Sequence, residues 1–114
     1  MKTLAAFVIG LFLVSLAFGA AVEKTGVLID NMCGAKVAAD AEKLSGHKVS
    51  CAMKCKDSGF GVVVDGTHLK FDTAGSEKAL ALLQNTSTTN NVMVKVAGNL
   101  EGDTLTVTSI EEVK

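Results

Sequence analysis

Short hydrophobic runs recur along the chain, some of them continuous and some alternating with polar residues, and both patterns are typical of β-strands. The predicted strands lie at residues 22–30, 60–64, 67–72, 92–97 and 104–110. The Asp65-Gly66 pair between the second and third runs is typical of a tight hairpin turn. Residues 101–103 contain a further turn signal before the last run. The chain is therefore predicted to form a five-stranded sheet.

Helical periodicity interrupts these strands in a few places. The segments with helical patterns are residues 37–44, 51–58 and 76–84. Ser50 is a possible N-cap of the second segment, and Gly59 stands where a C-terminal glycine is usual. Ser76 can cap the third segment, in which Leu80 and Leu83 share one face. We therefore expect one clear helix before the fourth strand and short helices before the second.

The order of these elements predicts the fold class. It is strand, cysteine-bearing insertion, two strands, helix and two strands, which is the order of a small five-stranded OB-like Greek-key barrel. In this mainly β fold the helix lies between strands 3 and 4, and the helical insertion lies between strands 1 and 2. The alternative is an open meander with two helices on one face. Residues 22–114 are expected to form a single OB-like β domain.

The N-terminus has the pattern of a signal peptide. Lys2 precedes an apolar run at residues 4–18, and small residues follow at positions 19–21. We expect residues 1–21 to be removed and the protein to be exported, periplasmic or secreted, without a stable membrane anchor after processing. An uncleaved helical anchor is the alternative.

Composition excludes some functions. The chain has no Arg, Trp or Tyr, and its net charge is −1. Nucleic-acid binding normally requires a basic face or stacking aromatic side chains, so no nucleic-acid partner is expected. The acidic residues show no paired-carboxylate pattern, and we expect a non-catalytic protein. Only Phe60 and Phe71 follow the predicted signal peptide as aromatic residues, so a disulfide or metal ion would help to stabilise the small core.

The insertion concentrates the residues capable of metal chemistry. Its candidate metal ligands are Cys33, His47, Cys51 and Cys55, and no cysteine lies elsewhere. Cys51 and Cys55 are four residues apart and would share one face of a helix. Three thiolates and one imidazole form a plausible ligand set for a single ion, copper or zinc.

Neighbouring residues bear on which metal this would be. Met32 and Met53 flank the cysteines, and thioether sulfur suits copper(I) better than zinc. Asp30 could supply an oxygen ligand, or it could simply end the first strand. His68 lies within a predicted strand and is expected to be a half-exposed strand residue. No haem-attachment or other cofactor-binding motif is present.

Two other uses of the cysteines stay open. The disulfide candidates are the same three residues, with Cys33 paired to Cys51 or to Cys55 and the third thiol left free. Alternatively the protein is a thiol–disulfide redox protein, because Lys48 and Lys54 could lower a cysteine pKa. The expected function is thus an exported binding module for a metal ion or a protein partner, with redox chemistry as the alternative.

The cluster also carries a resemblance. The pattern Asp-x-x-Cys-Gly at residues 30–34, then His47 and Cys-x-x-x-Cys at residues 51–55, resembles a group of small exported bacterial proteins for which no activity is established. The resemblance implies a bacterial, periplasmic protein whose cluster belongs to the group's pattern.

Overall fold

The computed structural model describes residues 20–114, so the signal-peptide prediction falls almost entirely outside the described residues. The protein is mainly β, as predicted. Its strands are β1 (Ala20–Asp30), β2 (Phe60–Val64), β3 (Thr67–Phe71), β4 (Met93–Glu101) and β5 (Thr104–Glu112). Asp65 and Gly66 have φ values of 49° and 79°, which confirms the predicted tight turn between β2 and β3.

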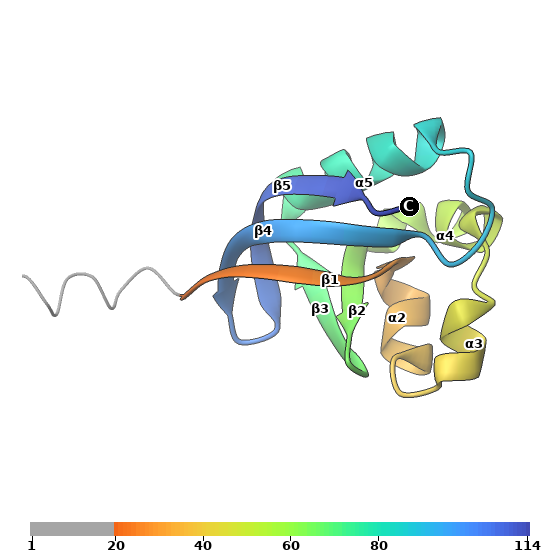
Figure 1. Ribbon diagram of the computed structural model, residues 1–114, viewed down its shortest axis with the longest axis horizontal. Coiled ribbons are helices and arrows are strands. Elements are labelled where there is room, and N and C mark those ends of the chain that lie inside the picture. The colour runs from red at the N-terminus through yellow and green to blue at the C-terminus, as the bar shows by residue number, and fades with distance from the viewer. Residues whose placement is uncertain (1–19) are drawn as a thin grey trace, which may run out of the picture.

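The five strands form one mixed sheet. Its order is β1-β2-β3-β5-β4, and β4 also pairs with β1, so every strand has two neighbours (Figure 1). All pairs are antiparallel except β3 with β5. The long strand β1 pairs with β4 through its first part and with β2 at its end. The end of β1 is therefore held by β2, through the Asp30–Phe60 pair, and this fixes the point where the insertion begins.

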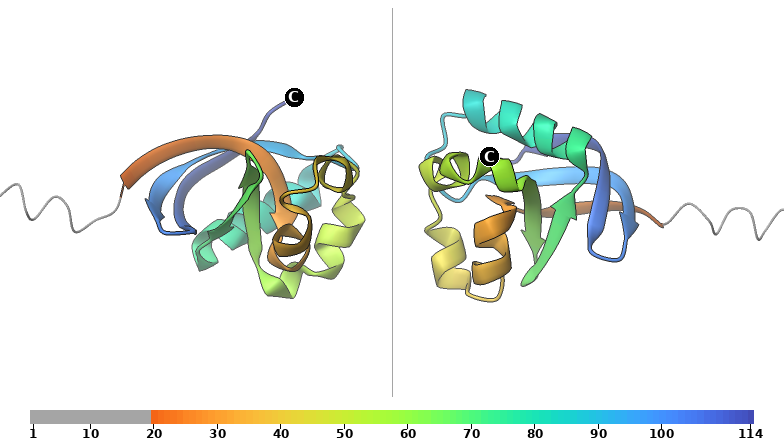
Figure 2. Two further views of the ribbon diagram at one scale, coloured as in Figure 1. Left: turned by 90° about the horizontal axis from the view of Figure 1, so that it is seen from below. Right: turned by 180° about the vertical axis from the view of Figure 1, so that it is seen from behind.

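The insertion between β1 and β2 is helical. It contains α2 (Asn31–Val37), α3 (Ala41–Ser45), α4 (Val49–Lys54) and the short 3-10 helix η2 (Lys56–Ser58), whereas α5 (Thr73–Asn85) connects β3 to β4. In Figures 1 and 2, α2, α3 and α4 gather at the end of the sheet where β1 ends. Among residues 20–114, no helix combines the length and the apolar character needed to cross a membrane.

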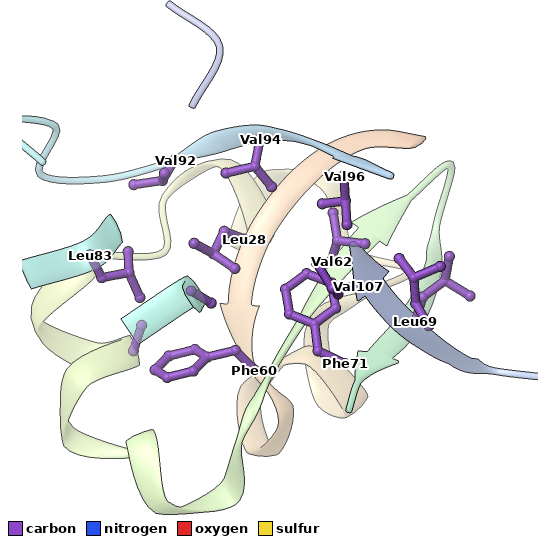
Figure 3. Close-up of a cluster of buried hydrophobic side chains, with 13 residues drawn as sticks. Leu28, Phe60, Val62, Leu69, Phe71, Leu83, Val92, Val94, Val96 and Val107 are labelled. Atoms are coloured by element: carbon purple, nitrogen blue, oxygen red, sulfur yellow. The ribbon is translucent and has the colours of Figure 1, made fainter. Parts of the chain in front are cut away.

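The core lies between the sheet and α5, and it is mostly aliphatic (Figure 3). Its fully buried side chains include Phe60, Val94 and Val96. On α5, Leu83 is buried as expected, while Leu80 is half-buried against the same cluster.

Helix starts differ from the sequence predictions. The predicted helix at residues 37–44 is wrong, because Asp40 interrupts it: its carboxylate accepts a hydrogen bond from the Lys43 N–H and starts α3 as a new helix. Asp72, not Ser76, caps α5 by accepting from the Gly75 N–H. The Ser76 hydroxyl instead accepts a bond from the Phe60 N–H in β2.

The cysteine-bearing helix also starts earlier than predicted. Ser50 is not its cap, because α4 begins at Val49 and the Val49 N–H donates to the Thr89 carbonyl. The helix ends at Lys54 and is followed by η2, so residues 51–58 are not one continuous helix. Gly59 ends the segment with φ of 81°, a left-handed conformation that favours glycine, as its predicted position implied.

Candidate metal centre

Asp30 is the most unusual residue of the described chain. It is the last residue of β1, and it is the single charged side chain among the buried residues of the described range, with 0% exposure. Its Oδ2 accepts a hydrogen bond of 2.9 Å from the Cys33 N–H and so caps the start of α2. Its Oδ1 has no hydrogen-bond partner among the described residues. Burying a carboxylate with an unpaired oxygen is costly, so this oxygen calls for an explanation.

His47 faces that oxygen. Its Nε2 lies 3.5 Å from Asp30 Oδ1, and Nε2 is likewise buried without a hydrogen-bond partner. The residue sits in the linker between α3 and α4, where its carbonyl accepts a 3.0 Å bond from the Asn91 N–H. His47 is thus held in place by the segment before β4. It lies outside α4, so it does not extend the helical face of Cys51.

Cys33 completes a three-residue group in the first turn of α2. Asp30, Cys33 and His47 each offer one ligand atom, and these atoms all lie within 4.8 Å of one another. Partial burial, then the charge of Asp30 and its hydrogen bonding to the thiol, and then Cys55 raise the pKa of Cys33 to about 11. At neutral pH the metal-free site therefore holds Cys33 as a thiol.

Cys55 and Met32 lie at the outer side of this group. The Cys55 thiol is 4.0 Å from the Met32 sulfur and close enough to Cys33 to raise its pKa. Cys51 is exposed on α4 and, within the described residues, is not part of this group of possible ligands. All three cysteines are free thiols in the structure. Met53 packs against the hydrophobic core.

The start of α2 is fixed by a second set of contacts. The Asn31 side chain donates to the Ser58 carbonyl at 3.0 Å, and its Oδ1 lies 3.0 Å from His68 Nε2. The His68 ring in turn packs on Gly34, where an added Cβ would lie 2.6 Å from Nε2. His68 is a half-buried residue of β3, as expected, and burial lowers its pKa. These contacts orient the helix turn that carries Cys33.

The sequence named three of the residues that the structure gathers here. Cys33 and His47 form the group, and Cys55 adjoins it. Asp30 was considered as an oxygen ligand but was not part of the predicted set of four. The available signal was its place at the end of a buried strand, three residues before a cysteine.

A separate open pocket does not coincide with this group. It has a volume of about 540 Å³ and is lined by Gly46, by residues 48–50 and by residues 86–90, most of which carry hydroxyl or amide side chains. It contains none of the three donor residues. We place the candidate site at Asp30, Cys33 and His47 because buried unpaired donors carry more chemical meaning than an open polar surface.

Comparisons with protein-family models, with curated proteins and with solved structures find no match to this chain. The fold and the site therefore define its class: a small, mainly β protein with an Asp/Cys/His group that could hold a metal ion. The resemblance to small exported bacterial proteins stays an expectation from sequence.

Proposed function

We propose that this protein is an exported binding module that holds one transition-metal ion, zinc or copper, between Asp30, Cys33 and His47. The carrying observation is the fully buried Asp30 carboxylate, whose free Oδ1 faces an equally unpaired His47 Nε2 at 3.5 Å. A bound cation would satisfy both atoms at once. It would also offset the cost of burying the charge.

The spacing of the donors supports this proposal. A zinc ion with bonds of about 2.0–2.3 Å in tetrahedral geometry has ligand atoms roughly 3.3–3.8 Å apart. The 3.5 Å separation of Asp30 Oδ1 and His47 Nε2 lies in that range. Cys33, within 4.8 Å of both, needs only a small side-chain adjustment. One oxygen, one nitrogen and one sulfur are a borderline donor set, which suits zinc(II) and copper(II).

The architecture supports the rest of the proposal. The strand order, the parallel β3–β5 pair and the placement of α5 between β3 and β4 support classification as an OB-like Greek-key barrel. In such barrels the connection between the first two strands borders the usual ligand face, which is where the candidate site lies. The signal-peptide pattern of residues 1–21 supports the proposed export to the periplasm.

A thiol–disulfide redox function is the second candidate, favoured by the proximity of Cys55 to Cys33. The raised pKa of Cys33 works against it, because thiol exchange requires a thiolate. In this alternative the Cys55 thiolate would attack the disulfide of a partner, and Cys33 would be the resolving thiol.

Metal analysis of protein purified from the periplasm without chelators tests the proposal. We expect close to one equivalent of zinc or copper and three titratable thiols after the metal is removed. Asp30→Asn, Cys33→Ser and His47→Gln should each abolish zinc binding.

The chain offers matched controls for two of these changes. Asp40→Asn alters another aspartate N-cap. Cys51→Ser alters the exposed thiol, and the proposal expects both controls to keep the metal. A metal-free protein with a reversible disulfide between Cys33 and Cys55 would instead support the redox function.

A further inference from the structure

A group of three sulfur atoms lies on the outer side of the candidate metal centre. Met32 and Cys33 belong to the first turn of α2, and Cys55 follows α4. Cys55 Sγ lies 4.0 Å from Met32 Sδ, and Cys55 is near enough to Cys33 to raise the pKa of its thiol. Adjacent residues of a helix point in different directions, so Met32 and Cys33 do not face each other directly. Cys55 is therefore the residue that lies near both other sulfurs.

Hydrogen bonds to backbone groups hold the two parts of this sulfur group together. The Ser58 hydroxyl accepts a 3.2 Å hydrogen bond from the Met32 N–H and donates a 2.8 Å bond to the Cys55 carbonyl. The Asn31 N–H also donates to the Gly59 carbonyl at 2.9 Å. The start of α2 is thereby tied to the turn after α4, although the residues are more than twenty positions apart in sequence.

The exposure of Met32 is a second indication that these sulfur atoms form a metal site. Its side chain is 53% exposed, and Met32 and Val113 are the two exposed large hydrophobic residues of the described range. The thioether thus remains at the surface beside a thiol, instead of packing in the core as Met53 does. Soft thiolate and thioether sulfurs prefer copper(I), whereas the oxygen of Asp30 does not suit that ion.

We propose that Met32, Cys33 and Cys55 form a second, all-sulfur site that binds copper(I) at the surface of the insertion. The site goes beyond the proposed function and does not require it. Cys33 belongs to both ligand sets, so a single thiolate is shared by the surface site and by the buried Asp30–His47 pair. Copper(I) and zinc(II) consequently compete for Cys33, although all of their other ligands differ.

Competition with a chromogenic copper(I) chelator under anaerobic, reducing conditions tests this site on the processed protein. Loss of a group that merely supports a metal ligand typically costs about 10- to 100-fold in affinity. Cys55→Ser should therefore weaken copper(I) binding roughly 100-fold or more, and Met32→Leu about tenfold. Met53→Leu and Cys51→Ser are the matched controls and should leave the affinity unchanged.

Zinc affinity, measured on the same variants, separates the two sites. Met32→Leu should not change it, while Asp30→Asn should abolish zinc binding and spare copper(I). X-ray absorption of the copper(I) protein should show a sulfur shell without nitrogen.

Either of two results would overturn the sulfur site: unchanged copper(I) affinity in Met32→Leu and Cys55→Ser, or a nitrogen ligand that disappears in His47→Gln. If zinc binding is absent but copper(I) affinity falls as expected, the sulfur site stands and the proposed Asp30–Cys33–His47 centre fails.

Discussion

Replacing Asp30 with asparagine distinguishes a metal ligand from a structural ion pair. The substitution removes the charge but keeps the size and shape of a side chain that is completely buried. The amide oxygen can still accept the 2.9 Å hydrogen bond from the Cys33 N–H, so the cap of α2 is retained. The amide nitrogen then takes the place of Oδ1, where it can donate to His47 Nε2, which has no hydrogen-bond partner.

The two roles predict different free energies of unfolding. If Asp30 and a protonated His47 are a structural ion pair, removing one charge should destabilise the protein by about 3–5 kcal/mol. If Asp30 is a ligand, the substitution removes from the metal-free protein a buried charge that has no ionic partner, and it should lower the free energy of unfolding by no more than about 1 kcal/mol. Zinc at 100 times its dissociation constant should stabilise the wild type by about 2.7 kcal/mol and leave Asp30→Asn unaffected.

Urea unfolding at neutral pH, with chelator and then with zinc, measures both quantities. Asp40→Asn is the control, because Asp40 also caps a helix through its side chain but faces no histidine. A loss of 3 kcal/mol or more in Asp30→Asn with chelator, together with no stabilisation of the wild type by zinc, would refute the ligand assignment.

Three further predictions concern the core, the thiol and processing. Leu83→Ala should cost about 2–5 kcal/mol in urea unfolding, because Leu83 is buried under α5, whereas Lys78→Ala should be near neutral. In metal-free protein the pKa of Cys33 is raised from 9.0 to about 11, so the native state holds this proton more tightly than the unfolded state. Stability should therefore fall as pH rises from about 9 to about 11, and Cys33→Ser should flatten this part of the profile. Mass spectrometry of the exported protein should find a mature N-terminus near Ala20 or Val22, and retention of residue 1 would contradict the signal-peptide prediction.

The sheet was largely predictable because its signals are local. Alternation marks β4, where Val94 and Val96 are fully buried and Lys95 between them is half-exposed. In β2 the signal is instead a continuous hydrophobic run, which is almost entirely buried. The Asp65-Gly66 turn needs only two residues that tolerate positive φ. The helix starts were harder, since several polar residues compete to cap one segment. Asp72 prevailed over Ser76 because its Oδ1 also accepts a bond from the Val107 N–H in β5.

The candidate site depends on contacts that sequence spacing does not contain. His47 reaches Asp30 because Asn91, far along the chain, bonds to the His47 carbonyl. The approach of Cys55 to Met32 depends on the Ser58 hydroxyl in the same way. Cys51 shows the opposite case, since the Cys-x-x-x-Cys spacing places it on α4 but tertiary structure leaves it exposed. The residue types indicated the chemistry of the site. Hydrogen bonds between residues far apart in sequence determine which of those residues lie together.

Metal binding should stabilise the insertion more than the sheet. Within α2, α3 and α4, Gly34 and Ala52 are the buried residues of the described structure, so these helices bury little apolar surface and should open locally at low cost. The proposed ion joins the end of β1 to α2 and to the linker that carries His47, and it binds that arrangement alone. Zinc should therefore slow amide hydrogen exchange in residues 31–59 by roughly 100-fold at 100 times its dissociation constant, since opening there breaks the site. Some amides of β4 and β5 exchange through local opening that leaves the metal site intact. Zinc should change the exchange rates of these amides little. Equal protection of both regions would mean that the insertion opens only when the whole domain unfolds, and no protection anywhere would contradict the metal centre itself.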